Sequence, residues 1–345
     1  MANAVHIDFP HRPAGHCGSG ALRDLLEFHG LSYDRTPPRE GLAFGLGGGL
    51  GFNYFELPGI EPPLYAVGRT AGLERDFCEH LGIELDLRRT DDADEGWAWL
   101  RGELDAGRPT MVNADIKELD YLRVRMNNTM HDIVVTGYDE GEGVAFIADN
   151  DRDEIQRCSL ESLARARNSQ GFPVPNRHAT WVMRFPEELP SPRPAVEAAL
   201  RRAVENMRVG GESLANAPGA PGLEHVAALA ASYPNWPERF DDSLGAALRG
   251  LRVFIVKAGT GGAMFRSLHA EFLEDAAALL DDPRLAEAAR TYGSLASAWV
   301  ALANAAGSSE DPAQAHAAGL EHIEVVARLE PEGVAAMERA ASALT

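Results

Sequence analysis

Hydrophobic and polar positions follow two different rhythms along the chain, and the rhythm changes near residue 190. Before this point, short apolar runs bounded by turn residues predict β-strands. The predicted strands are Thr110–Ala114, Asp132–Gly137, Gly143–Ala148 and Thr180–Phe185. Turn residues fill Tyr138–Gly143, between the second strand and the third, and this pattern predicts a β-hairpin.

After the proline-rich segment Pro186–Pro194, apolar residues recur at the spacing of amphipathic helices. The predicted helices are Ala195–Val209, Ala263–Leu280, Pro283–Ala306, Ala313–Leu329 and Pro331–Leu344. Two of them begin with an acid followed by a proline, which is a typical helix start. We therefore predict an α+β domain over residues 1–187 and an all-helical domain over residues 188–345.

The charge of the chain limits its partners. It has 52 acidic and 32 basic side chains, for a net charge of −20. Such a surface repels nucleic acid and anionic membranes, so we expect neither as a partner. No apolar run approaches the ~20 residues of a membrane helix, and the first ten residues lack the pattern of a signal peptide. We expect a cytoplasmic protein. The Ala-rich helices could pack against a second copy of the chain, so a homo-oligomer is a further possibility.

Three cysteines, at positions 17, 78 and 158, give no disulfide framework and no paired metal spacing. We therefore predict no metal site. Cys17 has the most informative surroundings, because turn-like residues from Gly15 to Gly20 precede a predicted helix over Ala21–Phe28. A helix N-terminus favours a thiolate and lowers the pKa of its cysteine. The alternative for any cysteine is a buried structural role, which we keep for Cys78 and Cys158.

A cysteine nucleophile needs a general base, usually a histidine that a third polar group orients. His131 begins the first strand of the predicted hairpin, and Asp149 lies at the end of the second strand. In an antiparallel hairpin the start of one strand lies beside the end of the next. His131 and Asp149 are thus predicted neighbours, and the alternative is a surface histidine and a turn aspartate.

The motifs HCGSGALRDLL, HDIVVTGYD and FIADN resemble the papain-like cysteine peptidase pattern, in particular the peptidase domains of bacteriocin-exporting transporters. The whole chain resembles more specifically the butirosin-biosynthesis acyltransferase (BtrH) family. The further signs are His-Cys at the helix start, the glycine-rich GLAFGLGGGLGFNYF (Gly41–Phe55) and KAGTGGAMFR (Lys257–Arg266).

The resemblance implies a papain-like fold that serves acyl transfer in antibiotic biosynthesis, a branch of secondary metabolism. The acyl group would come from the phosphopantetheine thioester of an acyl or peptidyl carrier protein and go to a small-molecule amine. Phosphopantetheine enters only as part of that donor, and no bound cofactor is expected.

The same resemblance assigns residue roles. Cys17 would be the nucleophile, His131 the base and Asp149 its orienting partner. Papain-like enzymes place a glutamine six positions before the cysteine, where this chain has His11. The candidates for the oxyanion donor are therefore His11, His16 and the backbone N–H of Cys17.

Other functions stay open on the same residues. A cysteine peptidase or amide hydrolase would use Cys17, His131 and Asp149 as well, and so would a carrier-dependent condensing enzyme that forms amides. A non-catalytic binding protein predicts a Cys17 that is no more reactive than Cys78.

Between Ser243 and Ala270 the chain has no acidic residue, but it has Arg249, Arg252, Lys257 and Arg266. Gly261 lies in a glycine-rich approach to the helix predicted from Ala263. Cations near a helix start can bind anions. We expect this basic segment to receive the phosphate of phosphopantetheine or the acidic face of the carrier, and the alternative is an ordinary solvated helix face.

The glycine-rich stretch Gly41–Phe55 would allow a close backbone approach to a ligand, and the alternative is a flexible surface loop. Among the aromatic residues, Tyr54 and Tyr121 are candidates for lining a substrate pocket. For each of them, a place in the core is the favoured alternative.

Overall fold

The computed structural model describes residues 3–33, 36–57, 59–212 and 220–344. The fold is α+β, as predicted, and the chain divides into two compact units. We call Met1–Pro38 with Leu81–Leu189 the sheet unit, and Arg39–His80 with Pro190–Thr345 the helical unit.

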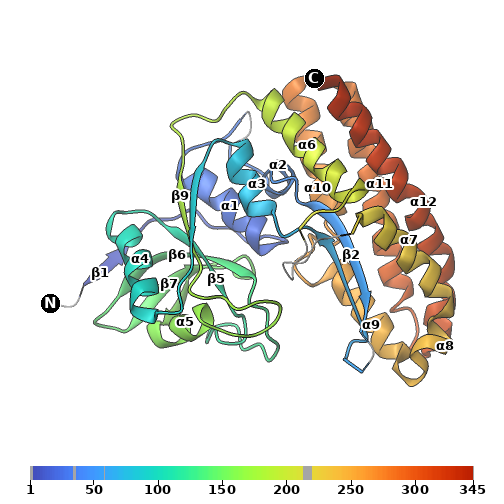
Figure 1. The fold of residues 1–345 in the computed structure, drawn as a ribbon, viewed down its shortest axis with the longest axis horizontal. Helices are drawn as coiled ribbons and strands as arrows, with labels where there is room; N and C mark the ends of the chain where they lie inside the picture. Colours follow the sequence, from blue (N-terminus) through green and yellow to red (C-terminus); the bar gives the residue numbers. More distant parts are fainter. Residues whose placement is uncertain (1–2, 34–35, 58, 213–219, 345) are drawn as a thin grey trace. The chain divides into compact units, whose positions relative to one another are not determined.

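The sheet unit is built on an antiparallel sheet with the strand order β4-β9-β5-β6-β7-β8, and β1 pairs with the last three residues of β6 (Figure 1). Its strands are β1 (Ala4–His6), β4 (Glu84–Arg88), β5 (Thr110–Ala114), β6 (His131–Asp139), β7 (Val144–Ala148), β8 (Gln156–Ser159) and β9 (Thr180–Arg184). Its helices are α1 (Cys17–Phe28), α4 (Ala93–Asp105) and α5 (Leu160–Arg167). The predicted β6–β7 hairpin is confirmed, and β5 has the predicted bounds.

The two faces of this sheet have different partners, because successive side chains on a strand point to opposite sides. Val112, Ile133 and Ile147 belong to a fully buried core that includes residues of α4 and α5. Met111 alternates with Val112, and it lines a cleft together with Leu25 of α1. Helix α1 therefore packs on the face opposite to α4 and α5, and its first residue, Cys17, lies near the start of β6.

The helical unit contains the long helices that the composition beyond residue 190 predicts. Its elements are α2 (Glu40–Leu46), β2 (Leu50–Glu56), β3 (Leu64–Arg69), α3 (Leu73–His80), α6 (Pro192–Arg208), α7 (Gly222–Ser232), α8 (Trp236–Phe240), α9 (Leu244–Val256), α10 (Arg266–Leu280), α11 (Pro283–Ala305) and α12 (Pro312–Leu344). Two short 3₁₀ turns flank α8, at Tyr233–Asn235 and Asp241–Ser243. Within the described residues, no helix combines the length and apolar character needed to cross a membrane.

One helix prediction is wrong at Pro331, which we expected to begin a separate helix. Pro331 lies inside α12, which continues without a break from Pro312 to Leu344. Its exposed ring removes one backbone hydrogen bond, but Val326 before it and Val334 after it are both fully buried. Packing on both sides of the proline keeps the helix continuous.

The domain prediction differs from the compact units at residues 39–80. We expected them in the N-terminal domain, but they belong to the helical unit. The glycine-rich stretch explains the difference, because it forms α2 and β2 and is almost wholly buried. It is therefore neither the ligand-binding loop nor the surface loop that the sequence left open. An added Cβ at Gly45 would overlap the ring of Phe272 on α10. Glycine is needed here for close packing on a helix.

A buried ion pair holds the same segment to the helices. Arg266 donates from Nε to Glu330 Oε1 at 2.8 Å and from Nη2 to Oε2 at 3.1 Å, and neither side chain is exposed. Arg266 Nη1 also donates to the carbonyl oxygens of Gly51 and Gly68 at 3.0 and 3.2 Å. Trp299 Nε1 donates to Glu330 at 2.7 Å, so each charge has several partners.

We predict that Glu330→Gln strongly destabilises the protein, because it leaves the Arg266 charge buried without a counter-charge. The expected loss is about 3–5 kcal/mol in the free energy of unfolding. The matched control is Glu338→Gln, which breaks the exposed ion pair with Arg208 and should cost no more than about 1 kcal/mol. Denaturant unfolding of both variants measures the difference, and equal losses would contradict this role for the buried pair.

Candidate active site

Cys17 is the first residue of α1, as its sequence surroundings predict. His16 is the N-cap, and its Nδ1 accepts the backbone N–H of Ser19 at 3.2 Å. Because Nδ1 is an acceptor, the neutral His16 ring carries its proton on Nε2. Leu22 and Leu26 are almost fully buried and fix the helix on its neighbours. The nucleophile candidate is thus held at a helix start, and it remains partly exposed.

His131 and Asp149 are neighbours, as the hairpin predicts. His131 Nε2 lies 3.0 Å from Asp149 Oδ2 and 3.1 Å from Oδ1. The Asp149 side chain has no exposed surface, and Tyr121 donates its hydroxyl to Asp149 Oδ2 at 2.7 Å. The carboxylate is therefore fixed from two sides, and it in turn fixes the imidazole.

The electrostatics favour a charged pair of Cys17 and His131. Burial opposes ionisation of Cys17, but the His16 imidazole and a hydrogen bond with His131 outweigh burial and hold the pKa of Cys17 well below its ordinary value. Burial likewise opposes charge on His131, but Asp149 and Cys17 raise the pKa of His131 well above its usual value. The pKa of Asp149 is lowered to about 2, because its charged and hydrogen-bonded partners outweigh burial. Both shifts favour the thiolate–imidazolium form of the pair.

The two other cysteines lack this setting. Burial raises the pKa of Cys78 and the pKa of Cys158 to about 12 each. Both are thiols at neutral pH, which fits the structural role that the sequence suggests for them.

Sequence reasoning missed Asp132, which lies beside the nucleophile. Its Oδ2 is 3.9 Å from Cys17 Sγ, and its Oδ1 accepts Asn113 Nδ2 at 2.7 Å. Trp181 Nε1 donates to Asn113 Oδ1 at 3.2 Å. The one sequence signal for Asp132 was its position directly after His131. Neighbouring side chains on a strand point to opposite faces, so this position did not suggest that both residues lie in one site.

The structure does not support His11 as an oxyanion donor. Its Nδ1 lies 2.9 Å from Asp24 Oδ2, and its Nε2 lies 2.9 Å from the carbonyl oxygen of Arg152. Both ring nitrogens thus have partners within the fold, and His11 fastens the segment before α1. His16 directly precedes Cys17 and stays a candidate.

The two tyrosines predicted to line a pocket have structural partners instead. Tyr121 supports Asp149, as described above. Tyr54 is buried in the helical unit, and its hydroxyl donates to Glu56 at 3.0 Å. Neither hydroxyl points to a role in substrate binding.

The predicted basic anion site is wrong at Arg266, which is fully buried against Glu330. Gly261 has a left-handed backbone, with φ +62°, and an added Cβ there would lie 2.6 Å from Leu268. Its conformation therefore explains the glycine without a ligand. Arg249, Arg252 and Lys257 are exposed, on α9 and at its C-cap.

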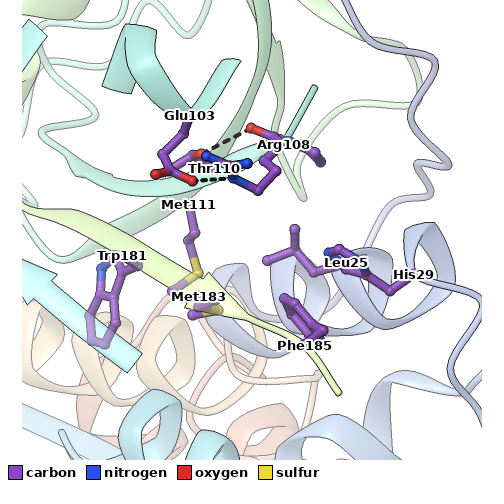
Figure 2. A pocket seen from close by; sticks show the side chains of 10 residues that line it. Leu25, His29, Glu103, Arg108, Thr110, Met111, Trp181, Met183 and Phe185 are labelled. Atoms are coloured by element: carbon purple, nitrogen blue, oxygen red, sulfur yellow. Dashed lines mark hydrogen bonds and ion pairs between the residues drawn. The ribbon is translucent and has the colours of Figure 1, made fainter. Parts of the chain in front are cut away.

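A small cleft lies between α1 and the strands β5 and β9 (Figure 2). Apolar side chains, among them Leu25 and Met111, form most of its lining, and Trp181 borders it. Its charged residues pair with each other, as Arg108 donates to Glu103 at 2.6 Å. These contacts give no reason to place a ligand in the cleft. Trp181 lines it and also donates a hydrogen bond to Asn113, which in turn holds Asp132. Among the residues that the structure describes, no group of three or more His, Cys, Asp or Glu side chains is arranged to hold a metal ion.

Comparisons with protein families match two parts of the chain. A family model described as butirosin biosynthesis protein H, N-terminal, matches residues 16–150. This match begins one residue before Cys17 and ends one residue after Asp149, so it spans the whole site. A second model, a domain of unknown function called DUF4872, matches residues 161–337. A search of curated proteins found no match.

We predict that iodoacetamide at neutral pH alkylates Cys17 well before Cys78 or Cys158. A lowered pKa keeps Cys17 a thiolate as the pH falls below the ordinary thiol value, and its labelling slows only below that lowered pKa. Peptide mapping after short exposure across a pH series measures each cysteine separately, and the two buried cysteines are the internal controls. Equal labelling of all three in the folded protein would contradict the predicted ionisation.

Proposed function

The chain belongs to the family defined by the N-terminal domain of butirosin biosynthesis protein H, and we propose that it is an amide-forming acyltransferase with a cysteine nucleophile. The family connects the chain to an enzyme of antibiotic biosynthesis. In this proposal the chain takes an acyl group from the phosphopantetheine thioester of a carrier protein and delivers it to an amine. The intermediate is a thioester on Cys17.

The observation that carries the proposal is the contact series Tyr121–Asp149–His131–Cys17. Tyr121 donates a hydrogen bond to Asp149, and Asp149 in turn holds the His131 ring. His131 favours the thiolate form of Cys17 at the start of α1. A nucleophile, a base and an orienting carboxylate in this order are the parts of a cysteine-based acyl-transfer site. The helix on an antiparallel sheet also supports a papain-like arrangement as part of the proposal.

In the first step the Cys17 thiolate attacks the carbonyl carbon of the donor thioester. The donor thiol leaves and takes a proton from the His131 imidazolium. One thioester replaces another, so little free energy changes. The backbone N–H of Cys17 and the Nε2–H of His16 would donate hydrogen bonds to the negatively charged carbonyl oxygen. Nε2 carries the proton of the His16 ring because Nδ1 accepts the backbone N–H of Ser19.

In the second step the amine attacks the acyl group on Cys17, and neutral His131 takes a proton as the amide forms. Cys17 leaves as a thiolate, which restores the starting ion pair. Transfer requires that the amine react faster than water, so the site has to favour the amine by binding it.

A hydrolase is the second candidate, because the same contact series activates water equally well. Nothing in the Cys17–His131–Asp149 geometry separates the two functions. They differ only in the acceptor, so the released product decides between them.

We propose that the exposed cations Arg249, Arg252 and Lys257 receive the donor's phosphopantetheine phosphate or the acidic carrier. Arg249 and Arg252 are three residues apart on α9 and share one side of the helix. Arg249 has a weak contact with Glu61, at 3.9 Å between two highly exposed groups. Cations with weak protein partners remain available to an anion on an otherwise acidic surface.

The acyl-enzyme is the first test of the proposed function. We expect that a small acyl thioester, such as acetyl-N-acetylcysteamine, adds one acyl group to the wild-type protein and none to Cys17→Ala. Intact-mass spectrometry measures the adduct, and Cys78→Ala is the matched control, which should acylate like the wild type. An added primary amine should then appear as an amide. Free acid as the sole product, with every amine supplied, would identify a hydrolase.

The docking proposal has its own test. We expect Arg249→Ala with Arg252→Ala to raise the apparent KM for acetyl-CoA, which carries the phosphopantetheine phosphates, by about tenfold. The same variant should use the uncharged acetyl-N-acetylcysteamine as the wild type does. Arg328→Ala, which changes another exposed arginine of the helical unit, is the control. An equal effect on both donors would contradict the proposal.

A further inference from the structure

A second carboxylate lies beside the nucleophile. Asp132 Oδ2 is 3.9 Å from Cys17 Sγ, and the residue is only 3 % exposed. His131 is oriented by Asp149. The site thus contains two buried carboxylates, and only Asp149 has a role in the contact series.

Two hydrogen bonds fix the direction of this second carboxylate. Trp181 Nε1 can only donate, so the Asn113 atom at 3.2 Å from it is the carbonyl oxygen. The amide nitrogen of Asn113 therefore faces Asp132 and donates to Oδ1 at 2.7 Å. With Oδ1 held in this way, Oδ2 is the oxygen that faces the sulfur.

Acylation does not explain this arrangement. A negative charge beside a thiol disfavours the thiolate, which is the form that attacks the donor. Burial opposes the thiolate as well, and the His16 and His131 imidazoles lower the pKa of Cys17. A buried acid that opposes the first step is expected to serve another one.

We propose that Asp132, held by Asn113, is the binding subsite for the acceptor amine. This inference rests on the proposed acyltransferase function and adds the recognition of the second substrate. The acyl carbon is bonded directly to Cys17 Sγ, and an attacking nitrogen has to come within about 3–3.5 Å of that carbon. A nitrogen in that position lies within reach of Asp132 Oδ2. A carboxylate accepts hydrogen bonds from an amine or an ammonium group and attracts the latter by charge.

The chemistry balances with groups that the chain supplies. The amine binds to Asp132 as an ammonium ion and loses one proton to solvent before it attacks. The nitrogen then forms a bond to the acyl carbon, and the bond from carbon to Cys17 Sγ breaks. The second proton goes to His131, and the sulfur leaves as the thiolate. The products are an amide and the starting thiolate–imidazolium pair.

The test separates the two steps. Wild-type protein and Asp132→Asn are acylated with acetyl-N-acetylcysteamine, and the adduct is followed by intact mass. Each acyl-enzyme then receives ethylenediamine, which is cationic at neutral pH, or hydroxylamine, which is neutral. We expect Asp132→Asn to acylate at least as fast as the wild type, because a charge that opposes the thiolate is gone. Its ratio of amide to free acid with ethylenediamine should fall by about tenfold or more, and its ratio with hydroxylamine should not change.

Asp153→Asn removes an exposed carboxylate elsewhere in the sheet unit and should behave as the wild type in every arm. Asn113→Ser keeps the Asp132 charge but removes its orienting amide, so it should lower the ethylenediamine ratio as well. This second variant keeps the proposal testable should Asp132→Asn not fold.

The outcomes are distinguishable. A wild-type protein that never acylates would overturn the proposed function and this inference with it. Acylation with an unchanged ethylenediamine ratio in the variants would overturn the amine subsite alone. Slow acylation of Asp132→Asn would instead make Asp132 a base for Cys17 and would also overturn the inference.

Discussion

The contact between His131 and Asp149 is the interaction on which the site depends. Asp149 has no exposed surface, so its charge requires a partner, and the imidazolium of His131 supplies one at 3.0 Å. The same contact assigns Nε2 of His131 to the carboxylate and leaves Nδ1 as the ring nitrogen for Cys17. A charged imidazole in turn stabilises the thiolate against the cost of burial. Asp149, directly after β7, thus supports the ionisation of the nucleophile through His131, and the His16 imidazole adds to it.

How far the sequence predicts this site depends on how local each contact is. His131 and Asp149 are 18 residues apart on two strands joined by one turn, so the hairpin alone predicts their contact. The Asn113–Trp181 contact joins β5 and β9 across 68 residues, and no local pattern contains it. Without that strand order, neither the orientation of Asp132 nor its place beside Cys17 can be deduced.

The helical unit shows the same limit. Composition predicts its helices well, because amphipathic spacing is a local property. Arg266 looked like a solvent-facing cation, since nothing near it in sequence offers a carboxylate. Its partner Glu330 is 64 residues away, and the pair is fully buried. The glycine-rich stretch was misjudged for a similar reason, because the Phe272 ring that requires a glycine at position 45 lies far along the chain.

The His131 imidazole, together with that of His16, favours the ionised form of Cys17. The ultraviolet absorbance of the thiolate, recorded over a pH titration as the difference between wild type and Cys17→Ala, measures this ionisation directly. The account predicts a thiolate signal that is fully present at neutral pH and disappears only well below the ordinary pKa of a thiol. In His131→Ala the transition should move to higher pH. A wild-type transition at the ordinary thiol value, unchanged by the loss of His131, would contradict the account.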